Sequence, residues 1–476
     1  MQGPVTQARS VRTLLAQICI VVVIAVSLVG IFVPSIVLGL TAGAALTVYL
    51  VLAWRQFTVA TWITVGLCVA LLSLALLRGI DVPTLSRGLE RMAFLAALLA
   101  LLGALRVVAS EAPEVVRAGR YLTAQPPSRR YLAMSLGGHV FGLLINLGGM
   151  AILLDMTRRS LDETSGPLPA ALRTWRLRRM TTAVLRGFSL VPLWSPLGLG
   201  LNALLLAMPG LAYGDVAPAG LAAAGMFLCW GWFLDWVRAP RIPPSHRRRS
   251  VPDPADRGGL ALLIVHVGSL GGLVLALHAL SALGFQQALL IAVPAYSLIW
   301  AALIGRRAAG GPPAAIRRAI TGTVRRFPAA AAEIGVFASA GLLSVLAVEL
   351  IPIERVQALV AGYVGAPWQM VVLLNLSLFA LATVGVNPII TAAVIGGLVA
   401  ELDVPGLSDA AAALCLAGTW GCVMGFTPLM TTVVYAGALV RQPPMVVGFG
   451  WNGLYCLSSL VLWTVGMALV AQMGIL

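Results

Sequence analysis

Residues 14–33 read LLAQICIVVVIAVSLVGIFV, a run without a single charged side chain. One membrane-spanning helix needs about 20 predominantly apolar residues, so this stretch is long enough to cross a bilayer. A second apolar run, residues 36–54, follows almost at once. A cleaved signal peptide would instead be followed by a small-residue cleavage site and a polar domain. The first run is therefore predicted to be a first span that stays in the protein.

Apolar runs of this length recur to the end of the chain. Hydrophobic residues make up 59% of the sequence and charged residues 10%, and the mean hydropathy is +0.95. A soluble protein needs far more polar surface to cover its core. The predicted fold class is an all-α polytopic membrane protein with about 10–12 transmembrane helices, two inverted repeats, re-entrant hairpins and broken helices.

The net charge of +15 comes from a chain in which every one of the 32 basic residues is arginine. These arginines cluster between apolar runs, as the positive-inside rule predicts, so nucleic-acid binding is not expected. Three arginine-rich loops, containing Arg173, Arg247 and Arg317, are separated from one another by two spans each. The predicted location is a bacterial cytoplasmic (inner) membrane, with these loops and the N-terminus in the cytoplasm.

Motifs for cofactor chemistry are missing from the sequence. All six cysteines lie in apolar runs without a CxxC pair, which argues against a disulfide frame and a zinc site. His139, His266 and His278 are predicted to pack or to hydrogen-bond between helices. No P-loop, GxSxG or diphosphate motif occurs, so we expect no cofactor, no metal, no ATP-driven pumping and no enzyme activity.

Two acid–arginine pairs are predicted near span ends. They join Asp155 to Arg158 and Asp235 to Arg238, and we expect both to be solvated surface pairs.

Four features recur in the same order, roughly 230–240 positions apart. They are an acid that begins an apolar stretch, an acidic turn with proline, an asparagine in a long glycine-bearing span, and a hydroxyl-Pro-Leu triplet. The first copies are Glu90, 111–114, Asn146 and 195–197, and the second copies are Glu333, 349–354, Asn387 and 427–429.

This repetition divides the chain into sequential parts. The predicted parts are a cytoplasmic tail (1–13), a first repeat (14–209), a second repeat (210–441) and a C-terminal extra helix (442–476). Each repeat contains an odd number of crossings by this count, so the two would insert with opposite topology. Inverted repeats with broken helices are typical of secondary transporters.

The order of scaffold helices, hairpin, broken span and further span resembles the ion transporter superfamily, which includes arsenite-pump, sodium–proton antiporter and divalent-anion symporter families. The asparagine breaks at Asn146 and Asn387 look like the paired clefts of those transporters. The resemblance implies transport of a small solute by alternating access.

The predicted substrate site lies at the helix breaks. An unwound segment frees backbone N–H and C=O groups, and a half-helix N-terminus favours an anion. The same residues could instead have purely structural roles. The breaks could be packing kinks, the glycines could allow close helix contacts, and the hydroxyls could bond to the backbone of the preceding turn. The candidate substrate-binding residues are Asn146, Gly148, Gly149, Ser195, Pro196, Gly385, Asn387, Pro388, Thr391, Thr427, Pro428 and Thr431.

Glu349 is the candidate residue for binding a coupling ion or proton. It precedes Pro352 in the second acidic turn, and an acid inside the membrane is costly to bury and therefore a functional candidate. At a water-exposed tip the same carboxylate would be inert.

The predicted function is a secondary active transporter that moves a small anionic solute across the membrane by alternating access. The expected partners are that solute or ion and the lipid bilayer, and a homodimer is left open. The alternatives are a membrane-embedded enzyme for lipid-linked substrates, a lipid scramblase or flippase, and a channel.

Overall fold

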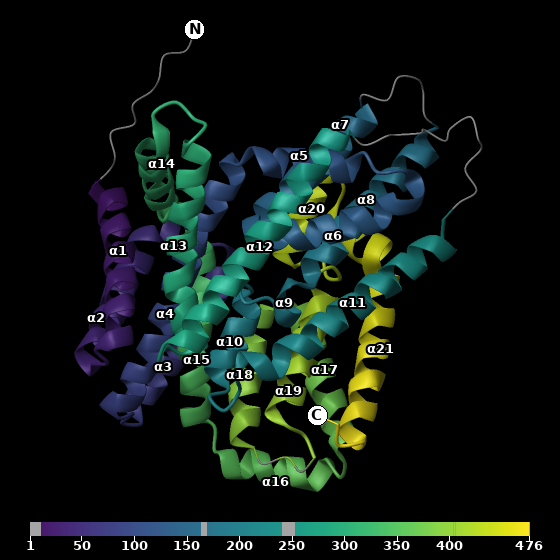
Figure 1. Ribbon diagram of the computed structural model, residues 1–476. Helices are drawn as coiled ribbons and strands as arrows, with labels where there is room; N and C mark the ends of the chain where they lie inside the picture. The colour runs from purple at the N-terminus through teal and green to yellow at the C-terminus, as the bar shows by residue number, and fades with distance from the viewer. Residues whose placement is uncertain (1–10, 163–168, 240–252, 403, 405, 476) are drawn as a thin grey trace. The chain divides into compact units, whose positions relative to one another are not determined.

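The computed structural model describes residues 11–162, 169–239, 253–402, 404 and 406–475. Within these residues the regular structure is helical, and ten helices are long and apolar enough to cross a membrane. The number rises to eleven if α16 (Ile353–Tyr363) and α17 (Pro367–Thr383), which meet at 117°, count as one broken span. The chain is a polytopic all-α membrane protein, as predicted (Figure 1).

The helices form two compact units. The first unit contains Met1–Ala104 and Val293–Leu350, and the second contains Leu105–Ala292 and Ile351–Leu476. Each unit therefore draws on both halves of the chain. The sequential repeat boundaries remain a prediction.

The first unit consists mainly of long apolar helices. Tyr49 Oη donates to the Phe327 carbonyl over 2.6 Å, and Thr61 Oγ1 donates to the Ala332 carbonyl over 3.1 Å, which joins the early helices to the later ones. Its elements are α1 (Val11–Phe32), α2 (Ile36–Ala53), η1 (Trp54–Gln56), α3 (Val59–Leu77), most of α4 (Val82–Glu111), the end of α13 (Phe285–Gly305), α14 (Gly311–Arg326), η3 (Pro328–Ala330) and α15 (Ala331–Leu350).

The second unit contains the interrupted helices. Its first group is α5 (Pro113–Thr123), α6 (Pro127–Ile145), α7 (Leu147–Asp162), α8 (Ala170–Ser189), α9 (Val191–Trp194), α10 (Leu199–Ala207), α11 (Tyr213–Val237) and α12 (Pro254–Leu280). The second group is α16, α17, α18 (Pro388–Glu401), α19 (Asp409–Val423), α20 (Thr431–Val440), the π-helical segment η4 (Val446–Asn452) and α21 (Gly453–Gln472).

The order of elements recurs within the second unit. α5 and α16 both have 11 residues, and each carries a glutamate in its first turn. α6 and α17 each begin with proline and are followed by a break with a positive φ, at Asn146 (56°) and at Gly385 (103°). The shared order supports duplication, while the inversion of topology stays a prediction.

Close packing of α6 against α8 forms the centre of the second unit. A Cβ on Gly138 would collide with the backbone of Val184, and a Cβ on Gly187 would collide with the carbonyl of Ser135. Glycine at both positions lets the two backbones approach, as small residues do between membrane helices.

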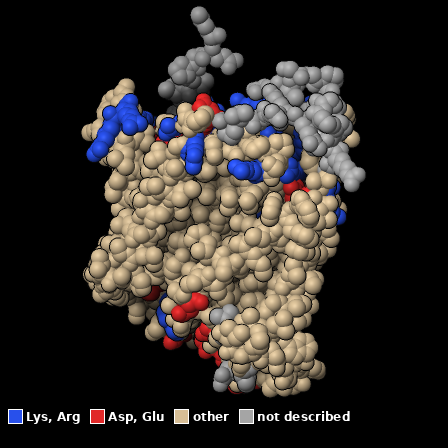
Figure 2. All heavy atoms as spheres, turned by 45° about the vertical axis from the view of Figure 1, so that its right-hand side comes forward, with Lys and Arg blue, Asp and Glu red and all other residues tan. Residues whose placement is uncertain are grey.

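Charged side chains occupy little of the visible surface. Figure 2 shows a face on which uncharged side chains predominate, with basic and acidic side chains gathered near its margins. Large apolar side chains such as Val37, Ile63 and Val265 are well exposed, which is expected of helices that face lipid.

Candidate functional site

The break between α17 and α18 contains Gly385 and Asn387. The positive φ of Gly385 is a conformation that a Cβ would strain. Asn387 Oδ1 accepts a hydrogen bond from the Ile389 N–H over 3.1 Å, so this side chain caps α18. Pro388 occupies the first helical position, where its missing N–H costs nothing. The Asn387-Pro388 motif therefore has a structural role in starting α18, whether or not it also binds a solute.

The two hydroxyl-Pro-Leu triplets fold in the same way. The Leu197 N–H donates to Ser195 Oγ over 3.1 Å, and the Leu429 N–H donates to Thr427 Oγ1 over 3.3 Å. The next helix begins four residues after the hydroxyl residue in both cases, at Leu199 and at Thr431. The local equivalence predicted from the sequence is present, and both hydroxyls take part in turns.

The structure joins two of the predicted breaks. Thr427 Oγ1, in the segment between α19 and α20, donates to the Thr383 carbonyl at the end of α17 over 3.3 Å. Thr432 at the start of α20 donates to the Met424 carbonyl at the end of α19. Residues 383–388 and 424–432 therefore form one connected region of interrupted helix.

Asn146 and its neighbours lie at another break. Asn146 follows the last residue of α6 and has a positive φ of 56°, and no hydrogen bond links it to Asn387 in the described part of the chain. A Cβ on Gly149 would lie 2.5 Å from the Phe141 carbonyl oxygen, so this glycine permits close packing, and Gly148 is partly exposed.

Four further candidate substrate-binding residues differ in exposure and in hydrogen bonding. Thr391 Oγ1 is buried without a hydrogen-bond partner, whereas Thr431 is exposed. The Pro196 carbonyl accepts from Asn202 Nδ2 over 2.8 Å, and Pro428 is partly exposed. Only Thr391 among these four offers an unused buried hydroxyl.

Glu349 belongs to the first unit, whereas the twelve predicted substrate-binding residues all belong to the second. Its side chain is exposed near the end of α15. The Leu350 carbonyl accepts from Arg78, the residue that ends α3, over 3.1 Å. Glu349 is therefore level with a helix end, and its role in coupling remains untested.

The sequence reasoning missed a buried arginine. Arg186 lies on α8, within Met180–Ser189, where every residue is buried. Its Nε donates to Asn452 Oδ1 over 2.7 Å, and its Nη1 donates to Tyr131 Oη over 2.8 Å. No carboxylate pairs with it among the described residues, and Nη2 makes no hydrogen bond there.

Aromatic and small residues complete this cluster. The guanidinium lies 4.3 Å from the ring centroid of Tyr455, within the range of a cation–π interaction. A Cβ on Gly231 of α11 would lie 2.8 Å from Tyr131 Oη, so glycine leaves this space open. Asn452 Nδ2 donates to the Gly425 carbonyl over 3.0 Å, which connects Arg186 to the break between α19 and α20.

We call Arg186, Tyr131, Asn452 and Tyr455 the arginine cluster. A membrane-embedded cation without a carboxylate partner is costly, by about 2.5–3.5 kcal/mol on insertion scales, and is rarely retained without a role. Two tyrosines and an amide reduce this cost but leave the positive charge in place. The arrangement can attract and bind an anion.

Unsatisfied polar atoms are concentrated in the second unit. Eight buried side-chain nitrogen or oxygen atoms lack a hydrogen-bond partner in the described part of the chain, and all eight belong to this unit. They come from Arg117, Ser135, Thr181, Asn202, Asn375, Thr391, Thr419 and Ser459. A buried polar atom without a hydrogen bond costs free energy unless water reaches it.

The predicted solvated pairs are corrected by the structure. Asp155 pairs with Arg159 over 2.8 Å, one helical turn away, and not with Arg158. Asp235 pairs with Arg179, not Arg238, in three hydrogen bonds of 2.8–3.0 Å. The side chains of the latter pair are only 12% and 10% exposed, because α8 and α11 lie against each other, a contact that residues close in sequence cannot reveal.

The histidine predictions have mixed outcomes. His139 Nδ1 lies 3.0 Å from the Gly187 carbonyl, and Trp194 Nε1 donates to His139 Nε2 over 3.0 Å, which confirms hydrogen bonding between helices. His278 lies 2.9 Å from the Leu283 carbonyl, just beyond its own helix. His266 faces Glu114, an acid that was not predicted to lie near it.

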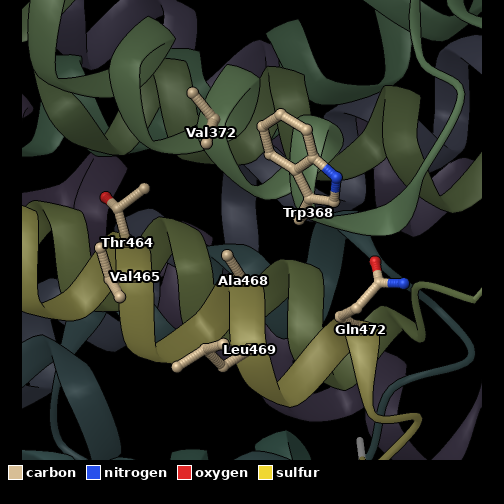
Figure 3. A pocket seen from close by; sticks show the side chains of 7 residues that line it. All are labelled: Trp368, Val372, Thr464, Val465, Ala468, Leu469 and Gln472. Atoms are coloured by element: carbon tan, nitrogen blue, oxygen red, sulfur yellow. The ribbon is translucent and has the colours of Figure 1, made fainter.

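A groove of about 380 Å³ runs between α17 and α21. Figure 3 shows Trp368 and Val372 on one side and the residues from Thr464 to Gln472 on the other. Its lining is apolar, so it suits a hydrocarbon chain better than a polar solute. None of the residues that line this groove belongs to the arginine cluster.

Metal binding finds no support in the described ranges, where no three His, Cys, Asp or Glu side chains come close enough together to hold a metal ion.

Two solved transporter structures align with this chain over most of its length. The YdaH transporter of Alcanivorax borkumensis, whose topology is described as unusual, matches over 88% of this chain and 99% of its own, with a TM-score of 0.60 and 15% identity. MtrF of Neisseria gonorrhoeae, described within a class of antimetabolite efflux pumps, matches over 88% and 97% with a TM-score of 0.47 and 12% identity. No family model and no curated protein matches the sequence. The chain has the fold of the YdaH transporter, so the predicted likeness to transporters holds at the level of the fold.

Proposed function

We propose that this chain is a secondary active transporter that moves a small anionic solute across a bacterial inner membrane by alternating access. The observation that carries the proposal is Arg186, a buried cation without a carboxylate partner among the described residues, bound to Asn452 and thereby to a helix break. The fold shared with YdaH supports the choice of a transporter over an enzyme or a channel.

The solute would bind where fixed charge and freed backbone meet. Arg186 supplies the charge, and the break at residues 424–430 supplies N–H and C=O groups that a continuous helix would use internally. Thr427 in the same break, and Asn387 in the break to which Thr427 bonds, contribute polar groups to the same proposed path. Membership of the ion transporter superfamily, an inverted repeat and a homodimer are compatible with this proposal.

The test uses purified full-length protein and four anions: sulfate, phosphate, acetate and succinate. At constant ionic strength, at least one anion should raise the unfolding temperature saturably and should exchange across proteoliposomes in a counterflow assay. Arg186→Gln should lose at least tenfold in the affinity for that anion, about 1.4 kcal/mol or more. Arg129→Gln, at an exposed arginine on α6, is the matched control and should bind as the wild type does.

The proposal fails if none of the four anions stabilises or crosses with the wild type. It also fails if Arg186→Gln binds and exchanges the anion normally.

A further inference from the structure

Glu114 and His266 form an acid–imidazole pair away from the arginine cluster. His266 Nε2 lies 3.4 Å from Glu114 Oε1, and the two side chains are 12% and 11% exposed. Both residues belong to the second unit. An isolated carboxylate is rarely buried to this extent unless it is paired or protonated.

His266 lies near the middle of a candidate membrane span. His266 is close to the midpoint of α12, which passes the length and hydropathy criteria for a span. It lies on the inward stripe of that helix, with Gly259, Leu263, Leu270 and Val274. The opposite face exposes Ile264 and Val265, as a lipid-facing surface would. His266 is thus many residues from either end of α12.

Tight packing fixes the level of Glu114 against α12. A Cβ on Gly259 would lie 2.8 Å from the Glu114 carbonyl oxygen, so the helix backbones are in direct contact. Arg120, further along α5, pairs with Asp256 over 3.3 Å. The two contacts make α5 antiparallel to the first half of α12, beside which it lies in Figure 1.

Other ionisable groups lie on α5 and α12. Arg117, three residues after Glu114, has a buried Nε without a partner and adds positive charge near the carboxylate. Arg120 and Asp256 are paired with each other. His278 lies beside the Leu283 carbonyl near the far end of α12.

Among the described contacts, α6 packs on both α5 and α12, and α7 packs on α5. On α6, His139 bonds the Gly187 carbonyl, and Arg130 donates to the Gln125 carbonyl over 2.7 Å. On α7, Asp155 pairs with Arg159, and Arg158 donates to the Leu439 carbonyl over 2.9 Å.

We propose that Glu114 and His266 form the proton-binding site that couples transport to the proton gradient. When the pair is closed off from water it holds one proton, as a carboxylic acid that donates to the neutral imidazole, and it carries no net charge. When α5 and α12 separate toward water on one side, that hydrogen bond breaks and the carboxyl proton passes to water, which leaves a carboxylate. The site is reloaded from water on the other side. This inference rests on the proposed transport function.

The first test measures proton binding without any substrate. Full-length protein in lipid nanodiscs is titrated with acid, and infrared difference spectra follow the carbonyl band of a protonated carboxylic acid. Glu114→Gln should remove one such band, and His266→Gln should shift its titration midpoint by at least one pH unit, a tenfold change in proton affinity. The exposed-pair variant Asp155→Asn should leave that band unchanged. An identical spectrum and titration for wild type, Glu114→Gln and His266→Gln would overturn the proposal.

The second test measures coupling in proteoliposomes. An imposed pH gradient should drive accumulation of the transported anion by the wild type, while Glu114→Gln should exchange the anion but accumulate it at least tenfold less. Accumulation by Glu114→Gln at the wild-type level would overturn proton coupling and leave the transporter intact. Absence of any anion flux in the wild type would instead refute the transport function, and the infrared result would still stand.

Discussion

Arg186 Nε lies 2.7 Å from Asn452 Oδ1, although the two residues are 266 positions apart in the chain. The amide nitrogen of Asn452 donates in turn to the Gly425 carbonyl over 3.0 Å. One side chain therefore orients a buried cation and satisfies a carbonyl freed by a helix break. Asn452 ends the π-helical segment η4, and such bulges occur often at functional sites.

Asn452→Ala should weaken anion binding as well as stability. The variant leaves a guanidinium N–H and a carbonyl without partners, which costs about 1–3 kcal/mol for each buried group. Unfolding in a mild detergent series measures the stability, and anion-dependent stabilisation measures the binding. Asn375→Ala is the matched control, because it removes another fully buried amide, bonded to Thr464 over 3.0 Å. If both variants lose stability equally and bind the anion equally well, Asn452 has no part in the site.

Asn387→Ala should abolish substrate movement while the protein remains folded and inserted. The lost cap of α18 costs about 1 kcal/mol, which a folded membrane protein can tolerate. Asn387→Ser separates the two roles, because serine is also a good cap but has no amide. If Asn387→Ser transports and Asn387→Ala does not, the role of Asn387 is to cap α18. If both variants transport, the break is a packing kink.

Asp235→Asn should destabilise the protein by about 3–5 kcal/mol, because it leaves Arg179 without its charge partner in a buried position. Asp155→Asn should cost less than about 1 kcal/mol, since Asp155 and Arg159 are both well exposed. Chemical unfolding of the two variants under one set of conditions provides the comparison. Similar losses from both would mean that the Arg179 pair is as solvated as a surface pair.

The sequence was sufficient for the fold class and for the breaks. Hydropathy alone predicts the spans, since each apolar run can be recognised from its own residues, and the Asn-Pro and hydroxyl-Pro-Leu motifs fold locally through their own side chains. Arg186 was missed because four arginines at 173–179 precede it and make it look like the end of a cytoplasmic loop. The available signal was its position inside the apolar run that begins at Met180.

Pairing between distant helices could not be predicted from one sequence. Asp235 has an arginine three residues away and a different one on α8, and only the packing of α8 against α11 decides between Arg238 and Arg179. The same holds for Glu114 and His266, which are 152 positions apart in the chain. The charges of the side chains show which residues are able to pair. The packing of the helices determines which of them do pair.

The arginine-rich segments around Arg173, Arg247 and Arg317 should all be cytoplasmic. After replacement of the six native cysteines, cysteine at any of these positions should resist an impermeant thiol reagent in intact cells. Arg173 and Arg317 are exposed on α8 and α14, so a negative result there would reflect sidedness, and position 247 lies outside the described residues. Glu401→Cys, at the exposed end of α18, is predicted to face outward and should react. Labelling of any of the three arginine positions from outside would refute the span count.

Glu349→Gln tests the remaining acid against Glu114. Glu349 is exposed, and the carbonyl of its neighbour Leu350 bonds Arg78 at the end of α3, so its carboxylate can be solvated at the end of a span. A solvated carboxylate needs no proton to remain stable and changes little on conversion to an amide. Glu349→Gln should therefore accumulate the anion within about twofold of the wild-type level, a difference of about 0.4 kcal/mol, under conditions where Glu114→Gln fails. If Glu349→Gln loses uphill accumulation while anion exchange survives, the coupling site is at Glu349, as the acidic turn in the sequence first indicated. If both variants accumulate normally, neither acid carries the coupling proton, and sodium or no coupling ion is left.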